Sequence, residues 1–540
     1  YVGNSIRNLQ KAEIDGQEVW NVSSLIVTEQ LEEALAPETP FERMKPGTAN
    51  EDGTWNLTYE PVPLRTVDLA ARMESRLPKE LPQTGNQGIT LRDVADGEAD
   101  LETFLSQLSD EDLKAIVRGE GMSSPKVTPG TAAAFGGVTD SLISLGVPIA
   151  CAADSPSGIR MEGGYSATQM PIGTLLACTW NPELAEELYT LEGKEMYANQ
   201  VDTLLGPGVN IHRHPLNGRN FEYFSEDPYL TGCFAAAAVR GMRAERGVGT
   251  VKHFAANNQE TARSEENSIV SERALREIYL KGFEMAVKEG GATSIMTSYN
   301  AVNGHWAASN YDLNTTILRG EWGYQGIVMT DWWACMNHPV NGGPSSRKRV
   351  SYMVRSQNDL YMVVPNHGAT DNANGDDLQE ALDEKSLTRG ELQRCAGNIC
   401  RFLMTVPCMD RNPKLQERVE LQKAFAETTE EMQEHALPLE ADLEYRMDFE
   451  HPLPLKVTEP GAYFMEARLS SASPEMSQVF MEFLLNKRSL LQVQMGGTLG
   501  KPSDRKLAKI RLEEGYYLLE GELQKPDLTI EWVKFHKLDQ

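Results

Sequence analysis

Polar and aromatic side chains follow a series of short apolar segments, at the point where each segment ends. In chain order they are Asp154, Arg160, Arg219, Lys252, His253, Tyr299, Asp331 and Trp332. Carboxylate, guanidinium, ammonium, imidazole and phenol groups can exchange hydrogen bonds with hydroxyl groups, and an indole can stack against a ring. A pocket lined in this way suits a neutral sugar. Nothing in these segments resembles a glycine-rich phosphate-binding loop.

Six apolar segments between residues 89 and 410 have the length expected of buried strands. They are 147–152, 204–209, 247–251, 294–297, 326–330 and 360–364. Helix-like segments separate them, and this alternation predicts βα units and a parallel sheet covered on both faces. The predicted fold class is α/β, with a (β/α)8-type barrel over residues 89–410. An open doubly wound sheet is the alternative, although no GxGxxG motif supports its dinucleotide-binding form.

In such a barrel, the side chains that carry out chemistry come from the carboxyl ends of the strands. The polar residues that end the apolar segments are therefore predicted to converge on one pocket. Met296 lies within the segment 294–297, and we expect it to line this pocket or to pack in the core.

One of the intervening helices is predicted over residues 272–288. Ser271 can cap its first turn, and Gly290 with Gly291 can end it. Its apolar face consists of Leu275, Ile278, Tyr279 and Phe283.

The composition changes on both sides of the predicted barrel. Residues 1–25 are strand-like and too few to fold alone, and residues 26–88 form an irregular connector with one short helix near 68–77. Residues 411–441 are predicted to be a helical connector. From 442 to 540 apolar residues alternate with period two, which predicts a β-sandwich. This part could bind carbohydrate or only brace the barrel, and its few aromatic residues (Tyr516, Tyr517 and Trp532) favour the bracing role.

Charge and cysteine content restrict the partners and the compartment. The chain has 540 residues and a formal net charge of −27, which disfavours binding to nucleic acid or to anionic membranes. No apolar run reaches the roughly 18–20 residues of a membrane helix. The 7 cysteines form no CxxC pair, and their odd number argues against a disulfide framework. We therefore expect a reducing, cytoplasmic location.

Four motifs then occur in a fixed order. They are "LLGPGVNIHRHPLNGRNFEYFSEDPYLTG", "VKHFAANNQE", "MTSYNAVNG" and "GIVMTDWW". Over residues 90–410 the chain closely resembles the barrel domain of family-3 glycoside hydrolases, chiefly β-glucosidases. In the circularly permuted branch of that family, an α/β sandwich and a fibronectin-like domain precede the barrel. Residues 1–25 resemble the tail of that fibronectin-like domain.

The resemblance implies a role for each candidate site residue. Asp331 is implied as the catalytic nucleophile, although an acid after a strand could also cap the next helix. Tyr299 is expected to donate its hydroxyl toward Asp331, and Trp332 to stack on the sugar while Trp333 packs. The implied sugar-binding residues are Asp154, Arg160, Arg219, Lys252 and His253, with Met296 as a lining residue. The family has Gly after the equivalent of Asp154, whereas this chain has Ser155.

Several supporting roles follow from charge. Lys252 and Arg219 are expected to lower the pKa of nearby carboxylates and so to keep Asp331 ionised. The acids Glu226 and Asp227, and likewise Glu260 with Arg263, are expected to form loop-bracing ion pairs that hold Arg219 and Lys252 in place.

No cofactor or metal is predicted. His212 and His214 have the spacing of a ligand pair, but no third ligand is placed near them and the family uses no metal.

The general acid is missing from the candidate residues. In the family it comes from the α/β sandwich domain, and nothing in this chain resembles that domain. The chain begins Tyr1-Val2-Gly3-Asn4, without an initiator Met or a signal peptide. We therefore expect a missing N-terminal portion or a second chain to carry the acid/base Glu. A homodimer is also compatible with the sequence.

The resulting functional prediction is an exo-acting retaining β-glycosidase that forms a covalent glycosyl-Asp intermediate. A β-D-glucosidase is the leading candidate, because Asp154 with Arg160 favours a sugar that has a C6 hydroxyl. A β-xylosidase or α-arabinofuranosidase is the nearest alternative. The alternative from another class is a catalytically inactive carbohydrate-binding protein.

Overall fold

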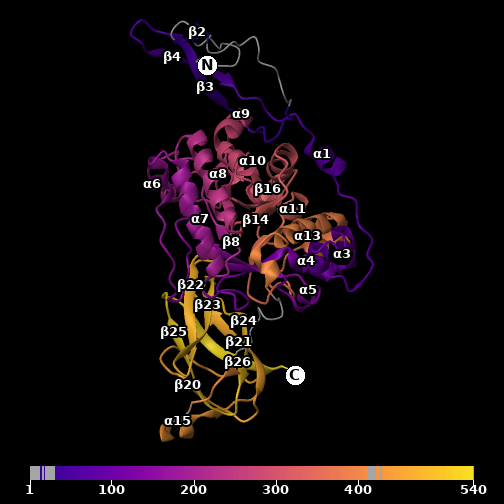
Figure 1. Cartoon of the computed structure of the whole chain (residues 1–540), viewed down its shortest axis with the longest axis vertical. Coiled ribbons are helices and arrows are strands. Elements are labelled where there is room, and N and C mark those ends of the chain that lie inside the picture. Colours follow the sequence, from indigo (N-terminus) through magenta and orange to yellow (C-terminus); the bar gives the residue numbers. More distant parts are fainter. Residues whose placement is uncertain (1–12, 15–16, 19–30, 412–420, 426–427, 539–540) are drawn as a thin grey trace.

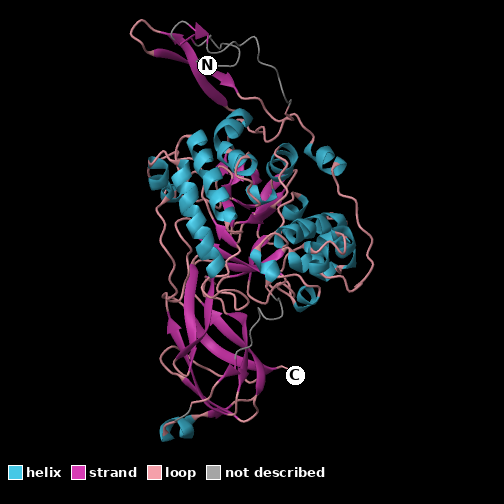
Figure 2. Cartoon of the chain, in the orientation of Figure 1, coloured by secondary structure: helices cyan, strands magenta, loops and turns pink. Residues whose placement is uncertain are grey.

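The computed structural model describes residues 13–14, 17–18, 31–411, 421–425 and 428–538. Figures 1 and 2 show an N-terminal hairpin, a central body of helices and strands, and an all-strand part that holds the C-terminus. Most of the segment predicted to be a fibronectin-like tail lies outside the described residues. Its described part is a pair of antiparallel two-residue strands, β1 (Glu13–Ile14) and β2 (Gln17–Glu18).

The central body is a mixed α/β unit around one eight-stranded sheet. Its neighbouring strands run in the order β14, β11, β9, β8, β7, β6, β5, β17. These strands are β5 (Arg118–Gly121), β6 (Ala133–Gly136), β7 (Ile149–Asp154), β8 (Thr203–Leu205), β9 (Val248–Phe254), β11 (Ser294–Thr297), β14 (Ile327–Thr330) and β17 (Tyr361–Val364). All six apolar segments of the sequence supply a strand, because runs of buried apolar residues fit a sheet covered on both faces.

The sheet curls until its two outer strands meet. β5 pairs with β17 in parallel, and β17 reaches β14 through a single parallel bridge between Met329 and Leu360. The amide of Thr330 donates to the carbonyl of Leu360 at 2.9 Å. The result is a nearly closed sheet, called the barrel-like sheet below.

One strand departs from the predicted parallel arrangement. β6 runs antiparallel to both β5 and β7. Residues 122–132 between β5 and β6 contain no helix, and a parallel crossover needs a connection of a dozen or more residues. The expectation of an all-parallel sheet is therefore wrong at this strand.

Helices cover the outside of the barrel-like sheet (Figures 1 and 2). They are α2 (Leu91–Ala95), α3 (Leu101–Gln107), α4 (Asp110–Ile116), α5 (Asp140–Ser144), α6 (Gly173–Cys178), α7 (Pro182–Ala198), α8 (Pro228–Ala244), α10 (Lys281–Lys288), α11 (Val350–Arg355), α12 (Leu378–Asp383) and α13 (Arg389–Leu403), together with the π-helix η5 (Asp312–Glu321). Among the described residues, no helix has both the length and the apolar character needed to cross a bilayer.

The helix predicted over 272–288 is present as three consecutive pieces. They are α9 (Glu272–Ala274), the π-helical turn η3 (Leu275–Tyr279) and α10. Ser271 caps it, accepting a hydrogen bond from the Ala274 amide at 3.2 Å. Leu275 and Phe283 are buried as predicted, but Leu280 is also buried. A π turn holds one residue more than an α turn, so the apolar face is displaced beyond it.

Short elements complete the central body. They are β10 (Asn267–Ser268), β12 (Ala301–Val302), β13 (His305–Trp306), β15 (Met336–His338), β16 (Gly342–Ser346), and the 3-10 turns η2 (Asn220–Glu222), η4 (Ala307–Ser309) and η6 (Pro407–Asp410).

The connector before the barrel-like sheet is more ordered than predicted. It contains an antiparallel hairpin of β3 (Glu42–Ala49) and β4 (Trp55–Pro61). The sequence predicts an irregular segment here and does not predict this hairpin. Helix α1 (Leu69–Ser75) lies where a short helix is predicted.

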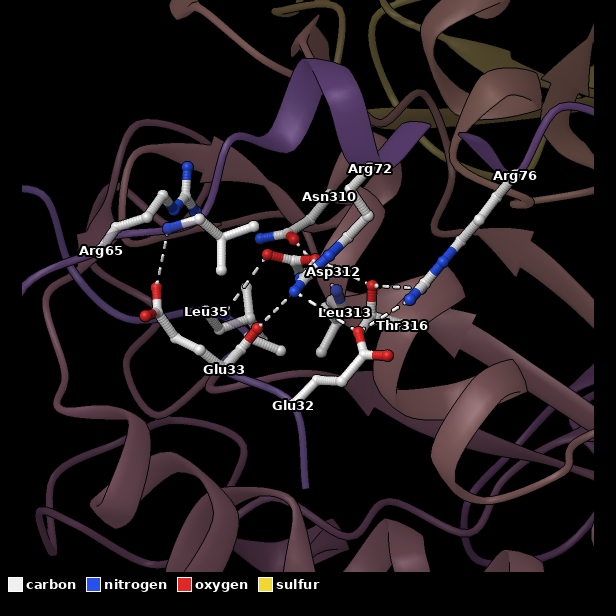
Figure 3. Close-up of polar contacts among 12 residues, drawn as sticks. Glu32, Glu33, Leu35, Arg65, Arg72, Arg76, Asn310, Asp312, Leu313 and Thr316 are labelled. Atoms are coloured by element: carbon white, nitrogen blue, oxygen red, sulfur yellow. Dashed lines mark hydrogen bonds and ion pairs between the residues drawn. The ribbon is translucent and has the colours of Figure 1, made fainter. Parts of the chain in front are cut away.

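Figure 3 shows how this connector is attached to η5. Arg72 on α1 forms an ion pair with Asp312 at 2.7 Å, and both side chains are buried. Arg76 donates to Glu32 at 2.7 Å and to Thr316 at 3.3 Å.

The C-terminal part consists of two sheets around one hydrophobic core. One sheet has the order β18, β24, β21, β26, and the other has the order β19, β20, β25, β22, β23. The strands are β18 (Leu421–Gln422), β19 (Leu437–Pro438), β20 (Leu453–Val457), β21 (Gly461–Ser470), β22 (Gln478–Leu485), β23 (Arg488–Gly496), β24 (Ser503–Leu512), β25 (Gly515–Leu523) and β26 (Thr529–Lys537), and helix α15 (Glu430–His435) lies between β18 and β19. Burial alternates along β21, as the period of two in the sequence predicts. Phe483, Tyr517 and Phe535 belong to the shared core.

These C-terminal sheets pack against the carboxyl-end side of the barrel-like sheet. Arg347 of the central body donates to Glu475 at 2.5 Å. Gln492 on β23 donates to the carbonyl of Gly163 at 3.4 Å. Figure 1 shows β22 and β23 reaching up to the central body.

Candidate active site

All nine candidate site residues line one pocket at the carboxyl ends of the strands. The pocket has a volume of about 220 Å³ and includes Asp154, Arg160, Arg219, Lys252, His253, Met296, Tyr299, Asp331 and Trp332. Their elements are far apart in sequence, and the curled sheet brings the strand ends together. The pocket is smaller than the roughly 300–1,000 Å³ typical of sites for larger ligands, which suits a single sugar ring.

Asp331 directly follows β14, and its two carboxylate oxygens have different surroundings. Oδ1 accepts a hydrogen bond from the Trp332 amide at 2.7 Å. Oδ2 is buried, has no hydrogen-bond partner among the described residues, and lies 3.7 Å from Nε2 of His253. The next regular element is the strand β15, so the alternative in which Asp331 caps a following helix is wrong. One oxygen is held by a backbone amide, and the other is buried without a hydrogen-bond donor.

Asp154 ends β7 and is held by two cations. Lys252 approaches Oδ1 at 3.3 Å, and Arg160 approaches Oδ2 at 3.4 Å. Burial raises the pKa of Asp154, but the charges of Lys252, Arg160 and Arg219 outweigh it and hold the pKa below its ordinary value. Asp154 is therefore an ionised hydrogen-bond acceptor. Ser155 donates its amide to Oδ1 at 3.0 Å, so this loop keeps its hold on the carboxylate without a glycine.

His253 is the neutral partner in this set. Burial, with the charges of Arg219 and Lys252, lowers its pKa well below the ordinary value. Its Nδ1 lies 3.2 Å from the hydroxyl of Tyr223, and its backbone amide donates to Asn210 at 2.8 Å. These contacts fix the ring, so that Nε2 lies on the side of Asp331.

Arg219 is positioned by a carboxylate that the sequence prediction missed. Its Nε donates to Glu222 within the η2 turn, and Glu222 also lies 3.8 Å from the ammonium of Lys252. Asp227, which was expected to brace this loop, instead caps α8 by accepting from the amides of Tyr229 and Leu230 at 2.8 Å. The spacing of Arg219 and Glu222 by three residues in one turn was a signal for this pair.

Arg263 is a further pocket residue that sequence reasoning assigned only to loop bracing. It forms the expected ion pair with Glu260 at 2.8 Å. Its guanidinium also lies 4.5 Å from the ring centroid of Tyr299 and lines the pocket. Burial and the negative charge of Asp331 raise the pKa of Tyr299 well above its ordinary value, so the phenol stays protonated.

The electrostatics at Asp331 differ from the expectation. Burial raises the pKa of Asp331 above its ordinary value, and the charges of Arg219, Arg263 and Lys252 only partly offset this effect. The prediction that cations hold this pKa low is therefore wrong in its net direction. The cause is the desolvation of a carboxylate that has one oxygen without a hydrogen-bond donor.

The aromatic wall contains both tryptophans. Trp332 lines the pocket as predicted, and Trp333 lines it too, although packing alone was expected of it. Trp333 has a φ of 58°, and its amide donates to the Met362 carbonyl at 2.7 Å. This left-handed conformation, which costs a non-glycine residue about 1–3 kcal/mol, turns the chain directly after Asp331.

The C-terminal sheets complete the pocket. Met476, Gln478 and Gln494 line it from the side opposite the strand ends of the barrel-like sheet. Gln494 donates to Gln478 at 3.3 Å and accepts from the hydroxyl of Ser123 at 3.3 Å. A bracing role alone is therefore an incomplete description of this part. Tyr517 and Trp532 are buried, so they offer no exposed surface for binding sugar rings.

The histidine pair considered as metal ligands has another use. His212 Nε2 contacts the backbone carbonyls of Asn220 and Tyr223 at 2.9 and 3.1 Å. Within the described part of the chain, no three His, Cys, Asp or Glu side chains gather in a way that could hold a metal ion.

Comparison with known families identifies the group to which this pocket belongs. A family model described as "Glycosyl hydrolase family 3 N terminal domain" matches residues 102–401. The chain belongs to glycoside hydrolase family 3. The resemblance stated from the four sequence motifs is thereby confirmed. In this family-3 chain, the matched region runs from α3 to α13 and contains the whole barrel-like sheet.

Relatives of this family-3 chain extend the match to its full length. A β-glucosidase of Ruminococcus albus is 44% identical over 100% of the chain and 56% of its own length. β-Glucosidase A of Butyrivibrio fibrisolvens is 36% identical over 73% of the chain and 46% of its own length. A crystal structure of a β-glucosidase from Paenibacillus barengoltzii has 58% identity and a TM-score of 0.78, covering 99% of this chain and 58% of that one. The chain thus spans a little more than half the length of the relatives that match all of it.

Proposed function

We propose that this chain carries the sugar-binding and nucleophilic half of an exo-acting retaining β-glycosidase, with β-D-glucosidase as its activity. The observation that carries the proposal is Oδ2 of Asp331, which is buried without a hydrogen-bond donor in a pocket lined by sugar-binding side chains. The β-glucosidase names of the full-length relatives support the same activity.

In the proposed reaction, a carboxylate oxygen of Asp331 attacks the anomeric carbon and the bond to the leaving-group oxygen breaks. A covalent glycosyl-Asp ester forms, and water later releases the sugar with net retention of configuration. The Trp332 amide holds Oδ1 at 2.7 Å and so fixes the orientation of the carboxylate. Only the ionised carboxylate can attack, so the raised pKa of Asp331 makes the reaction sensitive to acid.

The remaining pocket residues are proposed to hold one sugar ring. Asp154 accepts hydrogen bonds from ring hydroxyls, because its pKa is held low by Lys252 and Arg160. Lys252 and Arg219 donate to hydroxyls, and His253 does so as a neutral ring. Trp332 provides the apolar face against which the sugar stacks.

We propose that the general acid is none of the carboxylic acids that line this pocket. Besides Asp331, these are Asp154 and Glu162. Glu162 is engaged in an ion pair with Arg160 at 2.5 Å. Asp154 is paired with Lys252 and Arg160, which hold its pKa low, so it is a poor proton donor. The relatives that match the whole chain are longer than it, and their additional length leaves room for an acid/base Glu on another domain or a second chain.

Further parts of the proposal concern architecture and compartment. We assign the barrel-like sheet as a (β/α)8 barrel with one reversed strand, and the two C-terminal sheets as a β-sandwich. The cysteines are free thiols, which supports a reducing, cytoplasmic setting. A homodimer would be detected by light scattering.

The proposal is tested by intact mass spectrometry with 2,4-dinitrophenyl 2-deoxy-2-fluoro-β-glucoside. This leaving group needs little protonation, so the test reports on the nucleophile without the missing acid. We expect one fluoroglucosyl group on the peptide that contains Asp331, and none in Asp331→Asn. The exposed Asp96→Asn variant is the control and labels normally.

Other outcomes would overturn the proposal. Labelling by the fluoroxyloside alone would favour a β-xylosidase or α-arabinofuranosidase. Binding of glucose with no adduct from either reagent would favour a catalytically inactive carbohydrate-binding protein.

A further inference from the structure

A second cavity adjoins the sugar pocket, between the central body and the C-terminal sheets. Its volume is about 600 Å³. Met122, Trp333 and Gln494 line both this cavity and the first pocket. The second cavity therefore begins where the first ends. It is called the outer cavity below.

The outer cavity lies along strand edges of the C-terminal sheets. β23 is the last strand of its sheet, and its residues 492–496 line the cavity together with residues 505–507 of β24. The central body contributes residues 345–348 and 363–366 from the opposite side. Gly496 lies beside Trp333, and a Cβ at this position would make an ordinary van der Waals contact with the indole at 3.5 Å. The shared wall between the two cavities is thus packed from both parts of the chain.

The charges of the outer cavity contrast with those of the whole chain. Arg347, Lys348, Arg505 and Lys506 line it with a single carboxylate, Glu475. Arg347 is paired with Glu475, and Lys506 with Asp371. Arg505 and Lys348 have no ion-pair partner among the described residues. Two uncompensated cations face this cavity, in a chain whose net charge is −27.

Polar atoms without partners occur on the same lining residues. Arg505 Nε, Tyr361 OH, Gln492 Oε1 and Asn366 Oδ1 are buried and have no hydrogen-bond partner among the described residues. Leaving such groups unpaired is costly, most of all for a charged group. A guanidinium with free N–H groups matches a carboxylate in geometry and charge, and the neutral polar atoms match hydroxyl groups.

We propose that the outer cavity binds the leaving-group portion of the substrate, and that Arg505 with Lys348 selects a leaving group that carries a carboxylate. The proposal rests on the proposed function, because it places the glycosyl unit in the first pocket. The amide of Gln494 and the ring of Trp333 lie at the junction, where the scissile bond joins the two portions. The C-terminal sheets then determine which glycosides are cleaved.

The test compares two chromogenic substrates that differ by one carboxylate, 4-nitrophenyl β-glucoside and 3-carboxy-4-nitrophenyl β-glucoside. Both leaving groups are good, so neither depends strongly on a general acid. We expect Arg505→Gln to lower the ratio of kcat/KM for the carboxylated over the uncharged substrate by about tenfold, because it removes a charge-assisted hydrogen bond to the carboxylate. Lys348→Gln lowers the ratio less, because its ammonium lies in an exposed position.

The matched control is Arg446→Gln, which removes an exposed arginine from the same C-terminal part and lines neither cavity. It leaves the ratio unchanged. Arg505→Lys keeps the charge and retains part of the preference. Should Arg505→Gln fail to fold, salt titration of the wild type gives the same information, because NaCl lowers the ratio if charge attraction produces it.

Two outcomes separate this inference from the proposed function. Equal ratios in wild type, Arg505→Gln and Arg446→Gln, with normal hydrolysis of both substrates, overturn the inference and leave the proposed function standing. If neither substrate is hydrolysed, calorimetry of the carboxylated glucoside decides. Binding that weakens in Arg505→Gln but not in Arg446→Gln supports the outer cavity, and binding that is equal in both overturns it.

Discussion

At the residue scale, the two oxygens of Asp331 determine what the pocket can do. One oxygen is fixed by the Trp332 amide, and the other is buried without a donor. Burial makes this carboxylate harder to ionise, and Arg219 and Arg263 partly restore its ionisation. The sequence comparison alone points to Asp331, but the balance between burial and cations is a property of the folded pocket.

Arg263→Met tests this balance. Attack requires ionised Asp331, so activity is lost as the pH falls through the pKa of Asp331. The Arg263→Met substitution removes a positive charge that lowers the pKa of Asp331. Because this pKa then rises, the acidic limb of the plot of labelling rate against pH moves to higher pH. The measurement is the rate of inactivation by the dinitrophenyl fluoroglucoside from pH 4 to 8, values chosen to bracket carboxyl titration.

The matching control is Glu260→Gln, which keeps Arg263 and removes only its partner at 2.8 Å. Its acidic limb does not move to higher pH. An unchanged limb in Arg263→Met would show that this guanidinium does not act on Asp331.

At the element scale, helix α7 contains a buried acid that the proposed reaction does not use. Burial raises the pKa of Glu192 from 4.5 to about 8. Between these two values the folded chain keeps a proton that the unfolded chain releases, so the stability falls as the pH rises. Glu192→Gln removes this pH-dependent loss of stability. By proton linkage, its free energy of unfolding should exceed that of the wild type by about 3 kcal/mol at pH 7 and by almost nothing near pH 4.

Thermal unfolding at pH 4, 6 and 8, values that span the linkage window, measures this difference. Glu187→Gln on the exposed face of α7 is the control and shows no such pH-dependent gain. An advantage of Glu192→Gln that is equal at all three pH values would rule out the linkage.

The connector helix α1 gives a second prediction at this scale. Arg72 and Asp312 form a buried ion pair at 2.7 Å (Figure 3). Arg72→Met leaves Asp312 buried without its cation and should cost about 3–5 kcal/mol of unfolding free energy. Arg76→Met breaks a more exposed ion pair with Glu32 and should cost about 1 kcal/mol or less.

Urea unfolding of the two variants measures this contrast. Equal losses of unfolding free energy in the two variants would show that burial does not determine how much the Arg72–Asp312 ion pair contributes to stability.

At the scale of the whole molecule, the pocket is shared between parts of the chain that lie far apart in sequence. Gln494 hydrogen-bonds to Gln478 on β22 and to Ser123 after β5. Gln494→Ala is expected to raise KM for 4-nitrophenyl β-glucoside by roughly fivefold, because about 1 kcal/mol is lost per hydrogen bond. The acidic limb of the plot of labelling rate against pH, which reports the ionisation of Asp331, does not shift.

The control for this prediction is Gln524→Ala, an exposed amide at the end of β25, which leaves KM unchanged. A fall in kcat with no change in KM would mean that Gln494 acts on the nucleophile rather than on binding.

The sequence by itself determined the family, through its four motifs, and the α/β class, and it named nine of the residues that line the first pocket. The pocket residues could be named because apolar runs that end in polar residues mark strand ends, and strand ends converge in a curled sheet. It also predicted the period of two in the C-terminal strands, because one face of each strand is buried.

Only the tertiary structure decided the remaining features. β6 runs antiparallel because its connection to β5 contains no helix, and the apolar strand looks the same in either direction. Met476, Gln478 and Gln494 have no local sequence pattern that indicates a pocket, because their position depends on how the C-terminal sheets pack against the central body. The raised pKa of Asp331 likewise follows from burial, which no short motif records.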